Sequence, residues 1–376
     1  MITKTDADGL RGQRARNSAV ISLYLNVPVD LAEHRGLVTK ARELAKGEVP
    51  GEAAVAGQPA EADLEQVAAL VSAGCHDWLG QTVAIFVCGE LGLAETVPLP
   101  GYSPDRAVIA ARPYLRPLLA TLQRNPPYQV AIIDTKHAWV LAVAGDGIDT
   151  VAERTGQGVP SPGFAGWYGL EAYRVQQRVM QLARQHFRDT IGVLEQASDA
   201  QRHPLVLGGH EMQISQFLSI MPQAVRQRVA GSFAVDLQTA TPARVRQLAD
   251  PVIAGWAESA ETRLVEDLLS EPPGTAVTTS LDDCLTAVRS RAVANLAVAD
   301  DKMIPGYACE DCGKLGVDSG AGSARCDCPD PAQACTPVPD VLDDLTSQAL
   351  DGGGEVTAVR HAPFTAAARL RFRLPA

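Results

Sequence analysis

The sequence predicts a mixed α/β (α+β) protein with three domains. Short runs of apolar and β-branched residues, such as residues 19–27 and 82–88, alternate with stretches of helical periodicity. The chain has 376 residues, which is more than one hydrophobic core usually serves. A Pro-Pro-Gly break at residues 272–274 separates the last segment. We therefore expect domains over residues 1–126, 127–270 and 271–376.

The first domain is predicted from two buried strands and two helices. A polar tail precedes the strand at residues 19–27, and helices are expected near residues 37–46 and 61–72, ahead of the strand at 82–88. Residues 47–60 are rich in Gly, Pro and Ala, which is typical of a loop.

The second domain begins with a predicted β-hairpin. Residues 129–134 and 138–143 form its strands, and residues 148–154 would add a third. Residues 156–166 are dense in Gly, Pro and Ser, so we expect an exposed loop over 156–168 before a long helix. Later strands and helices alternate, and they are expected near residues 204–207, 211–221, 231–235 and 242–269.

The third domain is predicted from a helical pattern at residues 278–288, a buried strand at 293–298 and a helix at 338–350. Two further strands are expected near residues 355–359 and 366–372. A cysteine-rich segment, residues 307–336, interrupts this pattern.

The composition restricts the classes of function. The formal net charge is −11 at pH 7, which argues against binding of nucleic acid through a generally basic surface, so any RNA contact must be local. No apolar run approaches the ~20 residues of a bilayer span. We expect a cytoplasmic protein with no membrane partner.

Five of the eight cysteines lie close together in the sequence, and they predict a metal site. A CxxC pair followed by further cysteines after a flexible stretch is typical of structural, tetrahedral Zn²⁺. Four of the five would be ligands, and the spacing leaves the choice open; the other interpretation is a set of free thiols. Three more cysteines lie in apolar, core-like settings. The five candidate ligands are Cys309, Cys312, Cys326, Cys328 and Cys335, and the other three are Cys75, Cys88 and Cys284.

The helix after the glycine-rich loop carries four arginines on one side. At about 100° per residue they fall within roughly 120° of one another. Apolar residues occupy the opposite side, and no lysine interrupts the arginines. Guanidinium groups are good ligands for phosphates, although such a face is more commonly only solvated. The four residues are Arg174, Arg178, Arg184 and Arg188.

The chain resembles the archaeo-eukaryotic peptide-chain release factor and Pelota superfamily, and above all its bacterial members. The likeness lies in residues 164–188, 205–209 and 368–372, and in the order of the three domains. It implies that the middle domain has an RNase H-like fold. It also implies that the third domain resembles ribosomal proteins that bind kink-turn RNA, with the cysteine segment as an insertion.

The superfamily's release factors carry a Gly-Gly-Gln loop that positions water at the ester joining peptide to tRNA, and this sequence has no Gly-Gly-Gln. Two alignments of the loop are open. In one, Gly156-Gln157-Gly158 replaces the tripeptide and Gln157 is the candidate catalytic residue. In the other, which we favour, Ala165-Gly166-Trp167 stands directly before the helix. Gly166, Trp167 and Tyr168 would then contact RNA with the arginines, unless the Trp167 indole packs beneath the loop.

The resemblance implies a factor that binds the ribosomal A site, through rRNA and tRNA, in rescue, quality control or hibernation. A translational GTPase is a candidate delivery partner, and a monomer is expected. Pelota-like members act without hydrolysis. Two other functions remain open: a peptidyl-tRNA hydrolase that uses Gln157 or the loop backbone, and a zinc-containing protein-interaction module with no ribosomal role.

Overall fold

The computed structural model groups the chain into two compact units. One, here called the outer unit, comprises Met1–Arg124 and Ala260–Ala376, and the other, the middle unit, comprises Asn125–Ser259. The three-domain division at residues 126 and 270 stays a prediction. The structure describes residues 4–30, 32–46, 59–145, 147–156, 170–196, 203–272, 276–318, 326, 328 and 335–372, with residues 4–6, 8, 35 and 170–176 as backbone only.

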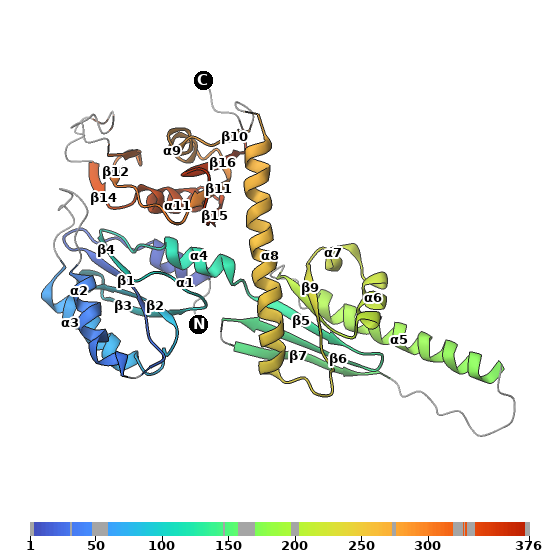
Figure 1. The fold of residues 1–376 in the computed structure, drawn as a ribbon. Helices are drawn as coiled ribbons and strands as arrows, with labels where there is room; N and C mark the ends of the chain where they lie inside the picture. Colours follow the sequence, from blue (N-terminus) through green and yellow to red (C-terminus); the bar gives the residue numbers. More distant parts are fainter. Residues whose placement is uncertain are drawn as a thin grey trace. The chain divides into compact units, whose positions relative to one another are not determined.

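The N-terminal part of the outer unit is an antiparallel sheet of order β3-β2-β1-β4 (Figure 1). Its two central strands, expected from the sequence, are confirmed, and their residues are buried except at the end of β1. The strands are β1 (Val20–Asn26), β2 (Thr82–Cys88), β3 (Leu93–Leu99) and β4 (Arg106–Ala110).

Helices cover both faces of this sheet. One core contains residues of α2 (Leu37–Ala45) and α3 (Glu61–Gly74), and the other contains residues of α1 (Lys4–Arg11) and α4 (Arg116–Arg124). Short 3-10 helices lie at η1 (Glu33–Gly36) and η2 (Gly89–Leu91). The expected polar tail was wrong in part. It contains α1, whose Ala7 and Leu10 are buried beneath the sheet although the rest of the helix is polar.

The C-terminal part of the outer unit contains a second sheet, of order β10-β16-β11-β15. Helices α9 (Leu281–Arg289) and α11 (Val341–Asp351) share a core with it. A separate three-stranded sheet, β13-β12-β14, carries Cys309 and Cys335. The strands are β10 (Val277–Thr278), β11 (Val293–Ala299), β12 (Gly306–Cys309), β13 (Leu315–Val317), β14 (Cys335–Val338), β15 (Glu355–Val359) and β16 (Ala366–Leu370).

Buried polar groups join the N-terminal and C-terminal parts of the outer unit. The Arg116 side chain donates to the Asp340 carboxylate and to the carbonyl oxygens of Ala299 and Lys302. The Tyr114 hydroxyl donates to the same carboxylate at 3.0 Å. Because a buried charge needs a partner and its hydrogen bonds, this network fixes the contact between the two parts.

The middle unit is a five-stranded mixed sheet of order β7-β6-β5-β8-β9. The predicted hairpin β5-β6 and the third strand β7 are confirmed as antiparallel, and β8 and β9 continue the sheet in parallel. The strands are β5 (Tyr128–Ile133), β6 (His137–Ala144), β7 (Gly147–Thr155), β8 (Leu205–Gly209) and β9 (Val229–Ala234).

Helices also cover both faces of the middle sheet. Residues of α5 (Leu170–Gln196), α6 (Glu211–Ile220) and α7 (Gln223–Arg226) form one core with it. The first part of α8 (Pro242–Ser270) forms the other core through Val245, Ala249 and Ile253. Helix α5 therefore lies on the sheet with one side of its second half, where its buried residues begin at Ala183.

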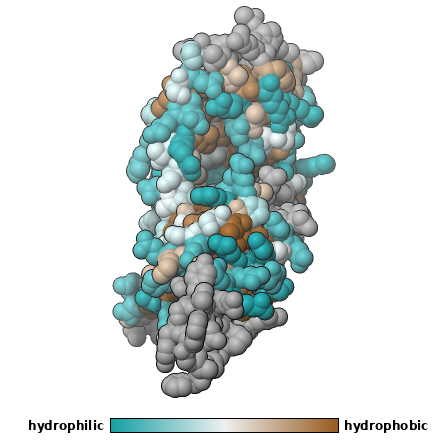
Figure 2. Space-filling model, turned by 90° about the vertical axis from the view of Figure 1, so that its right-hand side faces the viewer, coloured by the Kyte–Doolittle hydropathy of each residue, from teal (hydrophilic) through white to brown (hydrophobic). Residues whose placement is uncertain are grey.

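On the face shown in Figure 2, hydrophilic side chains predominate, and hydrophobic ones form small patches. Among the helices in the described ranges, none combines the length and the hydrophobicity that crossing a membrane requires.

Candidate functional site

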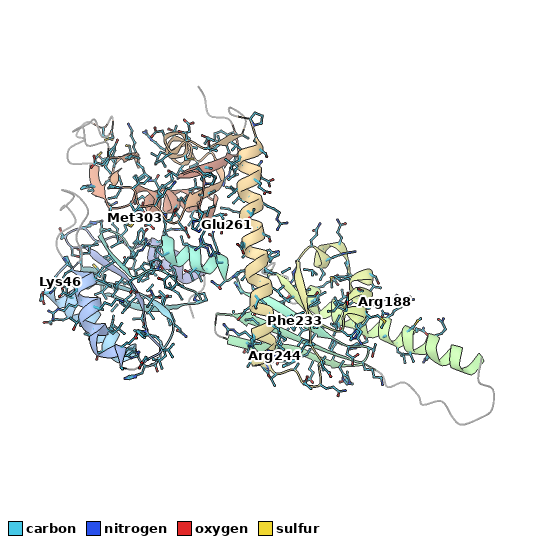
Figure 3. The ribbon with its side chains drawn as sticks, in the orientation of Figure 1. Lys46, Arg188, Phe233, Arg244, Glu261 and Met303 are labelled. Atoms are coloured by element: carbon cyan, nitrogen blue, oxygen red, sulfur yellow. The ribbon has the colours of Figure 1, made fainter. Side chains whose placement is uncertain are left out.

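The exposed side of α5 carries three arginines. Arg178, Arg184 and Arg188 are all exposed, whereas Phe187 and Leu194 are buried against the sheet (Figure 3 labels Arg188). Within the part of the chain that the structure describes, none of the three arginines forms an ion pair. The helix thus presents uncompensated positive charge in a protein whose net charge is −11. The role of these residues in RNA binding stays a prediction.

Several predicted site residues lie outside the described residues. They are Gln157, Gly166, Trp167 and Tyr168, and of Arg174 only the backbone, within α5, is described. Both alignments of the loop therefore remain open.

A cavity lies where β7 leads into that loop. It has a volume of about 460 Å³, and its lining includes Arg154, Thr155, Gly156, His186 and Asp189. With Glu153, which also lines it, the cavity combines a cation, an imidazole and two carboxylates close to the base of the loop. No sequence pattern predicts this cavity, since its residues come from a strand end and the middle of a helix.

His186 is the unusual residue of this cavity. Its side chain is buried, and its Nε2 has no hydrogen-bond partner among the described residues. Burial lowers the pKa of the imidazole below its ordinary value of 6.5, which favours the neutral form. The ring lies against the backbone of Gly156, where an added Cβ would be 3.3 Å from Cγ of His186. A buried, unsatisfied nitrogen beside a cavity is a ready contact for a ligand.

The cysteine cluster is brought together as the sequence predicted. The sulfur atoms of Cys309, Cys312, Cys326 and Cys328 all lie within 4.8 Å of one another, so these four could hold a metal ion. Cys335 on β14 lies opposite Cys309 on β12 in the antiparallel strand register. The Sγ atom of Cys335 is 3.5 Å from that of Cys326. Cys335 is thus in contact with this set of four, and which four of the five cysteines are ligands stays a prediction.

The geometry of the first pair fits a metal ligand. The Cys309 N–H donates to Lys314 O at 2.8 Å and the Gly313 N–H to Cys309 O at 2.9 Å, in a tight turn where Gly313 has a φ of +69°. The backbone N–H of Cys312 donates to the Cys309 sulfur and lowers the pKa of that thiol to about 6. The Sγ atoms of Cys309 and Cys328 are 3.7 Å apart. Zn–S bonds of about 2.3 Å in a tetrahedron place sulfurs about 3.8 Å apart.

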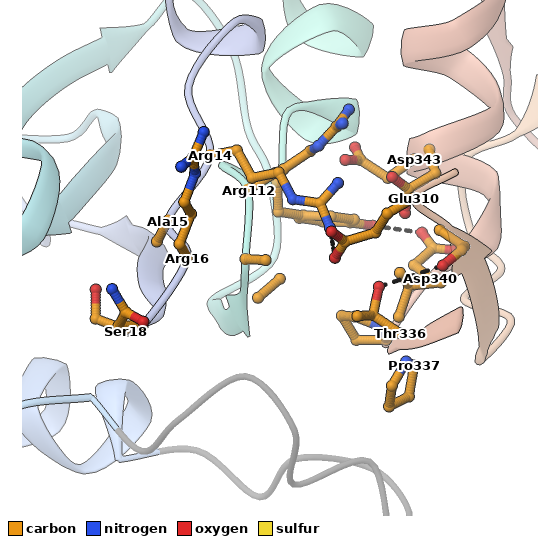
Figure 4. A pocket seen from close by; sticks show the side chains of 18 residues that line it. Arg14, Ala15, Arg16, Ser18, Arg112, Glu310, Thr336, Pro337, Asp340 and Asp343 are labelled. Carbon is orange, nitrogen blue, oxygen red and sulfur yellow. Dashed lines mark hydrogen bonds and ion pairs between the residues drawn. The ribbon is translucent and has the colours of Figure 1, made fainter. Parts of the chain in front are cut away.

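A larger cavity of about 700 Å³ lies between the N-terminal and C-terminal parts of the outer unit (Figure 4). Three arginines and four acidic residues line it, and part of this charge is paired within the chain, as in the ion pair of Arg14 with Glu310. Burial raises the pKa of Asp344 to about 6, although Arg112 and Arg14 oppose the shift. We interpret this cavity as part of the internal contact. The charged residues are Arg14, Arg16, Arg112, Glu310, Asp340, Asp343 and Asp344.

One family model matches the middle of the chain. Residues 113–254 match the model of bacterial archaeo-eukaryotic release factor family 10. This segment contains the whole sheet of the middle unit, helix α5 and its arginines. No curated protein matches the chain.

Three solved structures are similar at low identity. The archaeal translation termination factor aRF1 is 15% identical, with 99% of each chain covered and a TM-score of 0.26. S. cerevisiae Dom34, a translation termination-like factor, is 10% identical, with 78% of this chain and 80% of that chain covered and a TM-score of 0.38. Ribosome-bound archaeal Pelota is 14% identical, with 79% of each chain covered and a TM-score of 0.41. At these TM-scores the likenesses carry no argument about function.

Proposed function

We propose that this chain, whose residues 113–254 match the model of bacterial archaeo-eukaryotic release factor family 10, is a translation factor that binds the ribosome. The observation that carries the proposal is the exposed side of α5, where Arg178, Arg184 and Arg188 have no ion-pair partner among the described residues. Guanidinium groups bind phosphates through paired hydrogen bonds, and phosphate contacts position a protein on nucleic acid. The local positive charge allows RNA contact in spite of the acidic composition.

The finer role that we propose is occupancy of the ribosomal A site in rescue, quality control or hibernation. Gly166, Trp167 and Tyr168 would contact tRNA or rRNA ahead of Arg174 and the other arginines. An indole that stacks on a base contributes about 1–3 kcal/mol. In this reading the factor binds without hydrolysing the peptidyl-tRNA ester, since tryptophan has no amide with which to orient water.

The domain assignments belong to the same proposal. The mixed sheet β7-β6-β5-β8-β9, with helices on both faces, supports an RNase H-like middle domain. The third domain would resemble the kink-turn-RNA-binding ribosomal proteins, with the three-stranded cysteine sheet as its insertion. Structural Zn²⁺ would be held there by Cys309, Cys312, Cys326 and Cys328, whose sulfur spacing supports a tetrahedral site. We also propose that the protein is a cytoplasmic monomer and that a translational GTPase delivers it to the ribosome.

The second candidate function is hydrolysis of peptidyl-tRNA by Gln157. The cavity at the base of the loop supports this alternative. The Nε2 of His186, neutral and without a partner among the described residues, could accept a proton from a water molecule near Gln157. Stalled ribosomes that carry labelled peptidyl-tRNA distinguish the two candidates. We expect the ester to stay intact, and peptide release that disappears in Gln157→Ala would establish the second candidate instead.

Co-sedimentation of the purified chain with ribosomes tests the proposed function itself. Saturable binding that weakens with rising salt concentration is expected, because phosphate contacts release counterions. If the chain stays in the supernatant at low salt, with empty and with stalled ribosomes, the proposed function is wrong. The zinc-containing protein-interaction module would then be the remaining interpretation.

A further inference from the structure

A second group of side chains that could bind a metal lies in the N-terminal part of the outer unit. It is far from the cysteine cluster in the sequence, and the cysteine cluster belongs to a different sheet. One ligand atom each of His34, Cys75 and His76 lies within 4.8 Å of the others. His34 is on η1, while Cys75 and His76 follow the end of α3. Two elements that are remote in the sequence thus bring two imidazoles and a thiol to one point.

The hydrogen bonding of His34 leaves one ring nitrogen available. Its Nε2 lies 2.8 Å from the carbonyl oxygen of Pro28, which can only accept, so Nε2 carries the proton. The neutral ring then has its lone pair on Nδ1. That atom is buried and has no hydrogen-bond partner among the described residues. A metal-bound histidine commonly donates its other N–H to a backbone carbonyl, which fixes the tautomer in this way.

The turn that carries the other two ligands is well held. The Cys75 N–H donates to Val71 O at 3.0 Å, and the Asp77 N–H donates to Gly74 O at 2.9 Å. The indole of Trp78 packs so closely on Gly74 that an added Cβ would lie 2.2 Å from it. The Cys75 thiol makes only a weak contact, 3.6 Å to Ser72 O, and is partly exposed. The ligands are therefore positioned, while the thiol is free to exchange its contact for a metal.

We propose that His34 Nδ1, Cys75 Sγ and a ring nitrogen of His76 form a mononuclear site for a borderline divalent cation of the Zn²⁺ class. Mixed imidazole and thiolate ligands suit this class, and three protein ligands leave a fourth position for water. On binding, the Cys75 thiol releases its proton to solvent and the thiolate bonds to the metal. His76 is exposed, so the ion would enter from the solvent side.

Zinc content of the full chain tests this site separately from the cysteine cluster. After equilibration with Zn²⁺ and removal of loosely bound ion, His34→Ala, Cys75→Ser and His76→Ala should each contain about one equivalent less than the unchanged chain. The difference is the same whether or not the cysteine cluster holds zinc, so the two proposals fail independently. His76 is exposed, and its replacement should not affect folding.

His210→Ala is the matched control, because His210 is exposed and its side chain makes no capping hydrogen bond. Its zinc content should equal that of the unchanged chain. With Co²⁺ as a probe, Cys75→Ser should also lose the thiolate charge-transfer absorption of one sulfur, while His210→Ala keeps it. Equal metal content in the unchanged chain and in all three site variants would overturn the proposal.

Discussion

Arg116 and Asp340 form an ion pair that is almost completely withdrawn from solvent, with side-chain exposures of 6% and 0%. Arg116 begins α4, and Asp340 caps α11 by accepting from the Leu342 N–H at 3.2 Å. The contact therefore joins the two parts of the outer unit, which are more than two hundred residues apart in the sequence. Neither charge can be lost without leaving the other buried alone.

Replacing Arg116 with Met should lower the free energy of unfolding by about 3–5 kcal/mol, because it leaves the Asp340 carboxylate buried without its cation. Denaturant unfolding measures this. A double-mutant cycle with Asp340→Asn, which keeps a capping side chain, isolates the pair. Additive effects of the two changes would show that the pair contributes no coupling.

The Asp344 carboxyl should make the outer unit less stable as pH rises from about 4 to 6. Its folded pKa is raised to about 6 from 3.8, so between these values the folded state binds more protons than the unfolded state. Stability then falls with pH, by about 1–3 kcal/mol in all. Asp344→Asn should flatten this part of the stability profile. An unchanged slope in that variant would mean that Asp344 titrates normally.

His186→Leu should stabilise the middle unit, by about 1 kcal/mol at pH 7, since it removes a buried nitrogen that has no partner in the described structure. The pH dependence has the opposite sign to that of Asp344. The folded pKa lies below the ordinary 6.5, so the unfolded state binds the proton more readily and stability is lost as pH falls below about 6.5. Thermal unfolding at pH 5.5 and 7.5 checks both points. A less stable leucine variant at pH 7.5 would contradict this prediction and show that the hydrogen bond of the ring to the His137 backbone outweighs the cost of the unpaired Nε2.

Replacing Cys309 and replacing Cys335 should have different effects on the zinc content of the chain. Cys309→Ser should lose the zinc of the cysteine cluster, while Cys335→Ser should keep it, because Cys335 lies outside the set of four converging sulfurs. Chelation of the unchanged chain should expose the cluster thiols to alkylation and lower the melting temperature. Loss of zinc in Cys335→Ser alone would assign the fourth ligand to Cys335.

The sequence predicted elements whose signal is local. The apolar runs of β1 and β2 and the periodicity of α5 and α8 identified these elements directly. Strand β3 was missed because its exposed residues and Pro98 give it little apolar character, and it forms an edge of its sheet. For α1, two buried residues in a polar segment gave too weak a signal.

For the sites, the spacing of the cysteines predicted that they cluster, and the structure brings their sulfur atoms together. Cys75 was interpreted as a core residue from its apolar neighbours, and the structure instead leaves it partly exposed beside His34. His34 and Cys75 are 41 positions apart in the sequence and are brought together by tertiary packing, so no local sequence pattern indicates that they are neighbours. His186 likewise looks like any polar residue within a helix.

The central claim is that the arginine side of α5 binds ribosomal RNA, and matched charge reversals test it. Arg184→Glu with Arg188→Glu should weaken co-sedimentation with ribosomes at least about tenfold and reduce its salt dependence. The control, Arg226→Glu with Arg244→Glu, makes the same charge change at exposed arginines elsewhere on the same unit, and it should bind as the unchanged chain does (Figure 3 labels Arg188 and Arg244). Equal binding by both double variants would contradict the claim.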